Sequence, residues 1–115
     1  MSLTKNQKAV LDELRKVCRK NACLYRETQP HLHQRDLEKL GIGDQACVFS
    51  MGGLSYQVGP RLDMTASSVL SIFKALQRKG LIIREESYPD YQRPRYWWPL
   101  GLASELAAEL CEAKP

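Results

Sequence analysis

The sequence predicts an α+β fold that is mainly helical, with a small antiparallel pair of strands. Apolar residues recur at helical spacing near the N-terminus and again between residues 65 and 80. A β-rich run, LIIREES, follows the second helical stretch directly, and the run RYWW returns after a loop rich in tyrosine and proline. The length of 115 residues predicts one domain, residues 1–115, large enough to bury a core without disulfides or metal.

The composition is that of an ordinary globular protein, with 43% hydrophobic and 26% charged residues. A formal net charge of +4 permits binding to a polyanion without requiring it. No apolar run reaches the roughly 18 residues of a membrane span, and the N-terminal MSLTKNQK has no apolar signal core. We therefore expect a cytoplasmic protein with no membrane contact and with four reduced cysteines: Cys18, Cys23, Cys47 and Cys111.

The first expected helix covers residues 3–20. Thr4 and Gln7 have the spacing of a capping box, in which each side chain accepts a hydrogen bond from the other residue's backbone N–H. The apolar positions that follow predict one buried stripe. We interpret the opposite, cation-rich face as solvated surface. The alternative is that it contacts phosphates through Lys16, Arg19 or Lys20.

The segment 21–53 gives weaker signals. Residues 21–30 have the chemistry of a turn, and residues 34–40 predict a short helix. Residues 46–51, ACVFSM, favour a short strand, after which Gly52 and Gly53 would turn the chain. An effector pocket, a dimer arm and simple packing all stay open as roles for this segment.

Residues 54–80 predict a helix-turn-helix pair. Ser55 is a plausible N-cap for the first helix, whereas Pro60 requires that helix to start late or to be partly 3₁₀. Thr65 is a good N-cap for the second helix, and Gly80 suits its left-handed C-terminus. The second helix has an apolar stripe that predicts core: Val69, Ile72, Phe73 and Leu76. Its other face is polar: Ser67, Ser68, Ser71, Lys74 and Arg78.

Residues 57–82, QVGPRLDMTASSVLSIFKALQRKGLI, resemble the core of the winged helix-turn-helix transcription regulators, in particular the multiple-antibiotic-resistance-regulator and PadR-like groups. The junction from Lys79 to Ile82 is the most specific part, and Gly59 and Pro60 depart from the family pattern. The resemblance implies a winged helix: the helix-turn-helix at about 54–80, a β-wing at about 81–99 and a C-terminal helix at about 101–113.

The resemblance also implies sequence-specific binding to double-stranded DNA, in a transcriptional repressor or autoregulator. Such regulators usually bind as two-fold dimers, so we expect a homodimer built on the terminal helices. Serines near the start of the second helix would reach base edges, and cations farther along would reach phosphates. The predicted DNA-binding residues are Thr65, Ser67, Ser68, Ser71, Lys74, Arg78, Gln92, Arg93 and Arg95.

Two other functions stay open. The chain could be a winged-helix protein–protein interaction module within a larger assembly, or a plasmid or phage replication or partition factor that binds DNA. The arrangement of charge discriminates between them. Cations that converge on one surface favour DNA, whereas cations that pair with Glu85, Glu86 or Asp90 favour the interaction module.

Other chemistry has little support in the sequence. His31 and His33 lie near Cys23 and Cys47, but their spacing matches no zinc motif, so we expect no metal or cofactor. We expect no enzyme activity either. Glu85 and Glu86 are adjacent in a strand, so their side chains point to opposite faces and make a poor acid–base pair. The same alternation predicts that one ring of the Trp97–Trp98 pair caps the core. The other could then meet a partner.

Overall fold

The structure, a computed structural model, describes residues 2–86 and 95–112, with side chains up to residue 110. Its helices and strands are α1 (Lys5–Thr28), α2 (Pro30–Gly41), α3 (Val48–Met51), α4 (Ser55–Val58), α5 (Ala66–Arg78), β1 (Ile82–Arg84), β2 (Trp97–Pro99) and α6 (Leu102–Glu112). Short 3₁₀ turns, Gln45–Cys47 and Gly59–Leu62, precede α3 and follow α4. The predicted fold class, mainly helical with a small antiparallel sheet, is confirmed.

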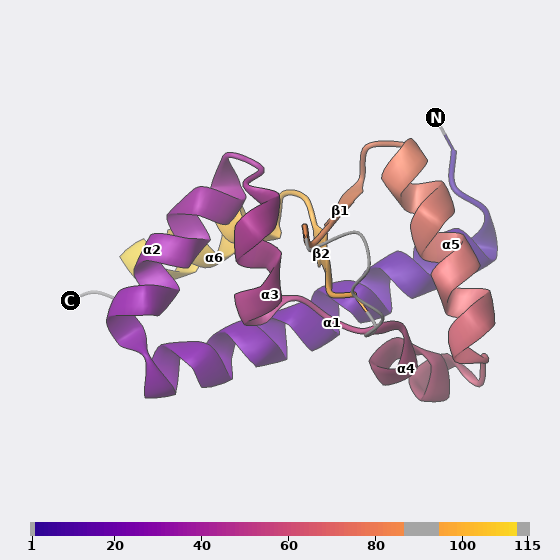
Figure 1. Cartoon of the computed structure of the whole chain (residues 1–115), viewed down its shortest axis with the longest axis horizontal. Coiled ribbons are helices and arrows are strands. Elements are labelled where there is room, and N and C mark those ends of the chain that lie inside the picture. The colour runs from indigo at the N-terminus through magenta and orange to yellow at the C-terminus, as the bar shows by residue number, and fades with distance from the viewer. Residues whose placement is uncertain (1, 87–94, 113–115) are drawn as a thin grey trace.

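The long helix α1 runs along the molecule from one end to the other (Figure 1). At one end α2 and α6 pack against α1, and at the other end α4 and α5 do so, with the two strands between them. The largest fully buried side chains come from several of these elements, among them Leu14, Phe73, Trp97 and Trp98. Within the described part of the chain, no helix combines the length and the apolar character that crossing a membrane requires.

The helix α1 is eight residues longer than predicted at its C-terminal end. The predicted Thr4–Gln7 capping box is present, with both hydrogen bonds at 3.1 Å. The prediction of a turn over residues 21–30 is wrong, because Ala22 extends the buried stripe and the Asn21 amide donates a hydrogen bond to the Gly52 carbonyl at 3.0 Å. Pro30 then opens α2, which includes the short helix predicted at 34–40.

The prediction of a strand at residues 46–51 is also wrong. The Asp44 carboxylate accepts a hydrogen bond from the Ala46 N–H at 3.0 Å and so starts a helical turn. Val48 and Met51, three residues apart, then share one buried face. A single residue, Gly53, takes the place of the strand: its N–H and C=O both bond to Trp97 at 2.8 Å. A Cβ on Gly53 would lie 2.9 Å from the Leu14 side chain, so glycine permits this close approach.

The two strands form a minimal antiparallel sheet in which Ile82 lies opposite Pro99. Both Trp97 and Trp98 are buried, with at most 1% exposed, so the prediction that one ring is free for a partner is wrong. Helices α1 and α3 pack against β2, and the Phe73 ring of α5 lies 5.2 Å from the Trp97 ring between centroids. A strand covered by helices on both faces has no solvent side, so alternation does not predict exposure here.

Candidate nucleic-acid interface

The first helix of the helix-turn-helix, α4, is a single turn. It starts at Ser55, so the N-cap position is Leu54, whose N–H donates to the Gln57 side chain at 2.8 Å; the expected Ser55 cap is wrong by one residue. The chain continues through a 3₁₀ turn, as Pro60 requires. Asp63 then adopts a left-handed conformation with φ 58°, which reverses the chain toward α5.

The second helix, α5, has the capping and packing that the sequence predicts. The Thr65 hydroxyl accepts a hydrogen bond from the Ser68 N–H at 3.1 Å, which confirms the N-cap. Gly80 has a φ of 76°, which ends the helix and allows the chain to enter β1. The apolar stripe is confirmed as core: Val69, Phe73 and Leu76 have no exposed surface, and Ile72 is partly buried against them.

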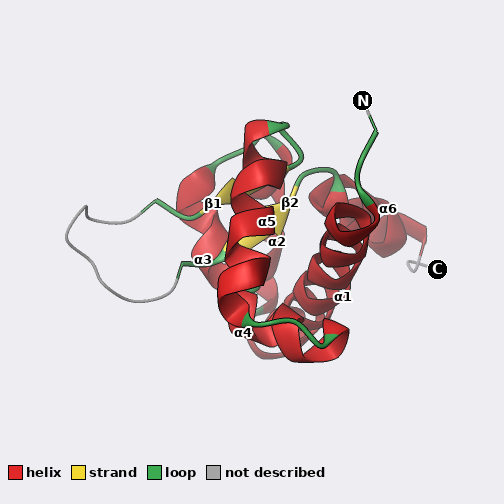
Figure 2. Ribbon diagram, turned by 90° about the vertical axis from the view of Figure 1, so that its right-hand side faces the viewer, coloured by secondary structure: helices red, strands yellow, loops and turns green. Residues whose placement is uncertain are grey.

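The outward face of α5 is uncovered and polar. Figure 2 looks onto this helix, with α4 at its foot and β1 beside it. All the predicted contact residues on the helix are exposed: Thr65, Ser67, Ser68, Ser71, Lys74 and Arg78. Among the described residues, the four ion pairs include neither Lys74 nor Arg78. The two cations on this face are therefore not neutralised by a described carboxylate.

Strand β1 packs against α5, at the start of the predicted wing. Arg95 is half-buried just before β2, while the predicted contacts Gln92 and Arg93 lie outside the described residues. Glu85 is buried just after β1: its N–H donates to the Tyr96 carbonyl at 2.9 Å, and its carboxylate accepts from the Tyr96 N–H at 3.2 Å. These two bonds join the residue after β1 to the residue before β2.

Two exposed arginines near the interface escaped the sequence reasoning. Arg61 lies on the 3₁₀ turn that packs against α5, and Arg84 ends β1 opposite Trp97. Two sequence signals could have identified them as candidate contacts. Arg61 is a cation inside the connection between the two helices, and Arg84 is a cation at the end of an apolar strand.

A cluster of polar side chains, separate from the α5 face, lies between α1, α2 and α3. The Tyr25 hydroxyl donates to the Asp36 carboxylate at 2.9 Å, and the Arg35 Nε donates to it at 3.1 Å. Burial acts to raise the pKa of Asp36, but these two hydrogen bonds bring it below its usual value. Burial and the nearby Asp36 raise the pKa of the Cys47 thiol, which therefore stays protonated near neutral pH and is a poor nucleophile. The cluster joins the helices.

The metal-ligand candidates do not gather. His33 is buried on α2, whereas His31 and Cys23 are exposed. In residues 2–86 and 95–110, no three histidine, cysteine, aspartate or glutamate side chains are arranged to hold a metal ion.

No family model matches the sequence, and no curated protein matches it. Among solved structures, the chain is similar to a crystal structure described as a MarR family transcription regulator. The two share 22% sequence identity with a TM-score of 0.37, over 84% of this chain and 77% of that chain.

Proposed function

We propose that this chain is a cytoplasmic, sequence-specific double-stranded DNA-binding protein that acts as a transcriptional repressor or autoregulator. The observation that supports it most is the outward face of α5, where exposed serines are followed by two cations free of described ion pairs. On the opposite face of the same helix Val69, Phe73 and Leu76 are fully buried, which orients the polar face outward. Repression would be steric, by occupation of an operator that overlaps a promoter.

In the proposed complex α5 lies in the major groove, where the four base pairs are distinguishable. Ser67, Ser68 and Ser71 occupy its first half and would contact base edges, with Thr65 at the N-terminus beside a phosphate. Lys74 and Arg78, one and two turns farther along, would contact phosphates. In the wing, Arg95 and the predicted Gln92 and Arg93 would reach the minor groove or the backbone.

The proposal includes a two-fold homodimer, because a single recognition helix reads too few bases for selectivity in a genome. The terminal helices would supply the contact, and α6 has an exposed small side chain at Ala108, on which a second copy could pack closely. Light scattering at micromolar concentration should give twice the monomer mass. A monomer mass both alone and on the operator would remove the dimer from the proposal.

The test is a selection of bound duplexes from random DNA, followed by fluorescence anisotropy on the selected and on a scrambled duplex. Replacing Ser67 and Ser71 by alanine should weaken binding to the selected duplex more than binding to the scrambled one. The matched control is Asn6→Ala, at an exposed position of α1, which should change neither. Equal loss on both duplexes would show that the serines do not read bases.

A protein–protein interaction module is the second candidate, and one observation favours it. Three large apolar side chains are more than half exposed on the surface of α1, α3 and α4: Leu24, Phe49 and Tyr56. If the selection enriches no duplex and binding to DNA is equally weak for all sequences, this candidate replaces the first. A replication or partition factor would instead enrich genomic fragments from an origin rather than from promoters.

A further inference from the structure

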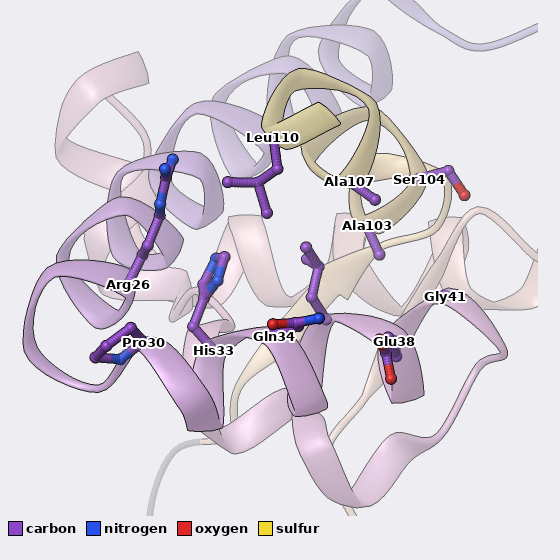
Figure 3. Close-up of a pocket in the computed structure, with 11 residues that line it drawn as sticks. Arg26, Pro30, His33, Gln34, Glu38, Gly41, Ala103, Ser104, Ala107 and Leu110 are labelled. Carbon is purple, nitrogen blue, oxygen red and sulfur yellow. The ribbon is translucent and has the colours of Figure 1, made fainter. Parts of the chain in front are cut away.

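The two ends of α1 meet the neighbouring helices in different ways. Toward its C-terminal end, α2 and α6 leave a cavity of about 430 Å³ between them, which Arg26 of α1 also lines (Figure 3). At the other end, the N-terminus of the chain lies beside the C-terminal end of α5 (Figure 1), and hydrogen bonds join the two segments. These bonds connect α1 directly to the helix that carries the proposed DNA-binding face.

Lys79, the C-cap residue of α5, makes this connection. Its ammonium donates a hydrogen bond to the Gln7 side-chain oxygen at 2.9 Å and another to the Ser2 backbone carbonyl at 3.5 Å. Lys79 and Gln7 are both half-buried, so water competes less for the shorter bond. Because hydrogen bonds from a charged donor are stronger than those between neutral groups, Lys79 fixes the distance between the two helix ends.

The acceptor of the shorter bond is itself held in place. The same Gln7 oxygen accepts the Thr4 N–H at 3.1 Å, within the capping box that starts α1. Leu3, just before the helix, packs against the hydrophobic core. The first turn of α1 is therefore a fixed point to which Lys79 can attach the end of α5.

The Lys79 side chain lies on a different side of α5 from the exposed cations. Arg78, the preceding residue, is exposed, and a turn of about 100° per residue brings the next side chain toward α1. The ion pairs of the described residues do not include Lys79, so its bonds to Gln7 and Ser2 are to neutral oxygens. Its position is suited to orienting the helix rather than to contacting a duplex.

The other contacts of α5 constrain its N-terminal end and its rotation. The Met64 N–H donates to the Gly59 carbonyl at 2.9 Å, which holds the turn from α4. The burial of Phe73 against Trp97 keeps the apolar stripe inward. Apolar contacts are not directional, whereas a hydrogen bond has a narrow range of distance and angle. The bond from Lys79 therefore adds a directional constraint at the C-terminal end.

We propose that Lys79 is a positioning residue for DNA binding: its bond to Gln7 fixes the tilt of α5 against α1, and so the places where Ser67 and Ser71 meet the base edges. This inference rests on the proposed function. Hydrogen bonds to bases require close distances and good angles, whereas phosphate contacts carry no sequence information. Loss of the Lys79–Gln7 bond should therefore reduce selectivity more than it reduces binding to DNA of any sequence.

The test measures the affinity of the full chain for the selected and the scrambled duplex by fluorescence anisotropy. Lys79→Met keeps the length of the side chain without the donor, and should lower the ratio of the two affinities about five- to ten-fold. Lys79→Arg keeps a charged donor and should restore most of that ratio. Gln7→Leu should reproduce the loss with every cation still present. Gln7→Glu retains an acceptor for both hydrogen bonds and should keep the ratio.

Thr4→Ala is the matched control, because it removes the other half of the same capping box and leaves the Gln7 oxygen in place. It should keep the ratio, and urea denaturation compares its stability with that of Gln7→Leu. An equal loss of selectivity in Thr4→Ala would mean that stability of the first turn, and not the bond to Lys79, is responsible, which would overturn the proposal.

Two further outcomes separate this inference from the proposed function. A salt slope lowered by about one in Lys79→Met, with normal selectivity in Gln7→Leu, would show that Lys79 contacts a phosphate itself and would overturn the inference alone. Normal selectivity in both variants would do the same. If the unmodified chain selects no duplex, the proposed function fails and the inference fails with it.

Discussion

Helices α1 and α5 are both amphipathic with cations on the outward side, yet the structure treats those cations differently. On α1, Arg15 pairs with Glu105 and Arg19 pairs with Glu109, both from α6. On α5, Lys74 and Arg78 have no ion pair among the described residues. A count of basic residues cannot separate these two cases. The carboxylates that pair with Arg15 and Arg19 come from the other end of the sequence.

The pairing on α1 follows from helix geometry. Arg15 and Arg19 are four residues apart, as are Glu105 and Glu109, so two adjacent helices present matching rows of opposite charge. All four side chains are partly exposed, and such pairs contribute little stability, about 0–1 kcal/mol each. Their main effect is to remove two positive charges from the surface that polyanions can reach.

The largest expected effect concerns the side of α5 opposite its cations. Phe73 is fully buried against Trp97, so Phe73→Ala should lower the free energy of unfolding by about 3–5 kcal/mol through lost burial and a cavity. Ser71→Ala, on the exposed face, should change it by less than about 0.5 kcal/mol. Urea denaturation followed by tryptophan fluorescence measures both. Similar losses would mean that the two faces of α5 are not distinct.

The next prediction compares the cations directly. Replacing Lys74 and Arg78 together by glutamine should weaken DNA binding roughly ten- to a hundred-fold and reduce the salt slope by about two, because two counterion-releasing contacts are lost. The matched double replacement of Arg15 and Arg19, which are already paired, should leave affinity and slope nearly unchanged. Anisotropy titrations at several salt concentrations give both values. Equal effects would remove the distinction between the helices.

The same contrast explains how much the sequence predicts. Helix α5 was predictable because its signals are local: the Thr65 cap, the buried stripe and Gly80 all lie within one short segment, and periodicity alone places Ser67 on the exposed side. The chain from Lys79 to Ile82 likewise leads from helix to strand as expected.

Apart from the one-residue error in the Ser55 cap, the failures involve contacts between distant segments. Residues 46–51 are β-prone in composition, but the bridge to Trp97 needs only Gly53, which leaves them free to form a helical turn. The burial of Trp98 depends on helices packed over both faces of β2. The pairing of Arg19 with Glu109 is similarly invisible from local sequence, and the wing contacts Gln92 and Arg93 stay predictions.

The N-caps of the two helices allow a finer comparison. The Thr4 and Thr65 side chains both accept a backbone N–H at 3.1 Å, so each replacement by alanine should cost about 1 kcal/mol of stability. Only Thr65→Ala should also weaken DNA binding, because the start of α5 would fray in the groove. Thermal unfolding and anisotropy on the same two variants test this. If Thr4→Ala weakens binding as much, stability rather than position accounts for the loss.

The smallest expected effect comes from releasing the cations of α1 without removing them. Replacing Glu105 and Glu109 by glutamine should change stability by no more than about 1 kcal/mol per pair, since the pairs are partly exposed. Binding to a scrambled duplex should strengthen slightly, with a steeper salt dependence. Binding to the selected duplex should strengthen less, so the ratio of the two affinities falls. An unchanged salt slope would mean that Arg15 and Arg19 lie too far from the duplex to reach it. In that case the position of α1 in the fold, rather than its pairing with α6, would keep this helix out of the interface.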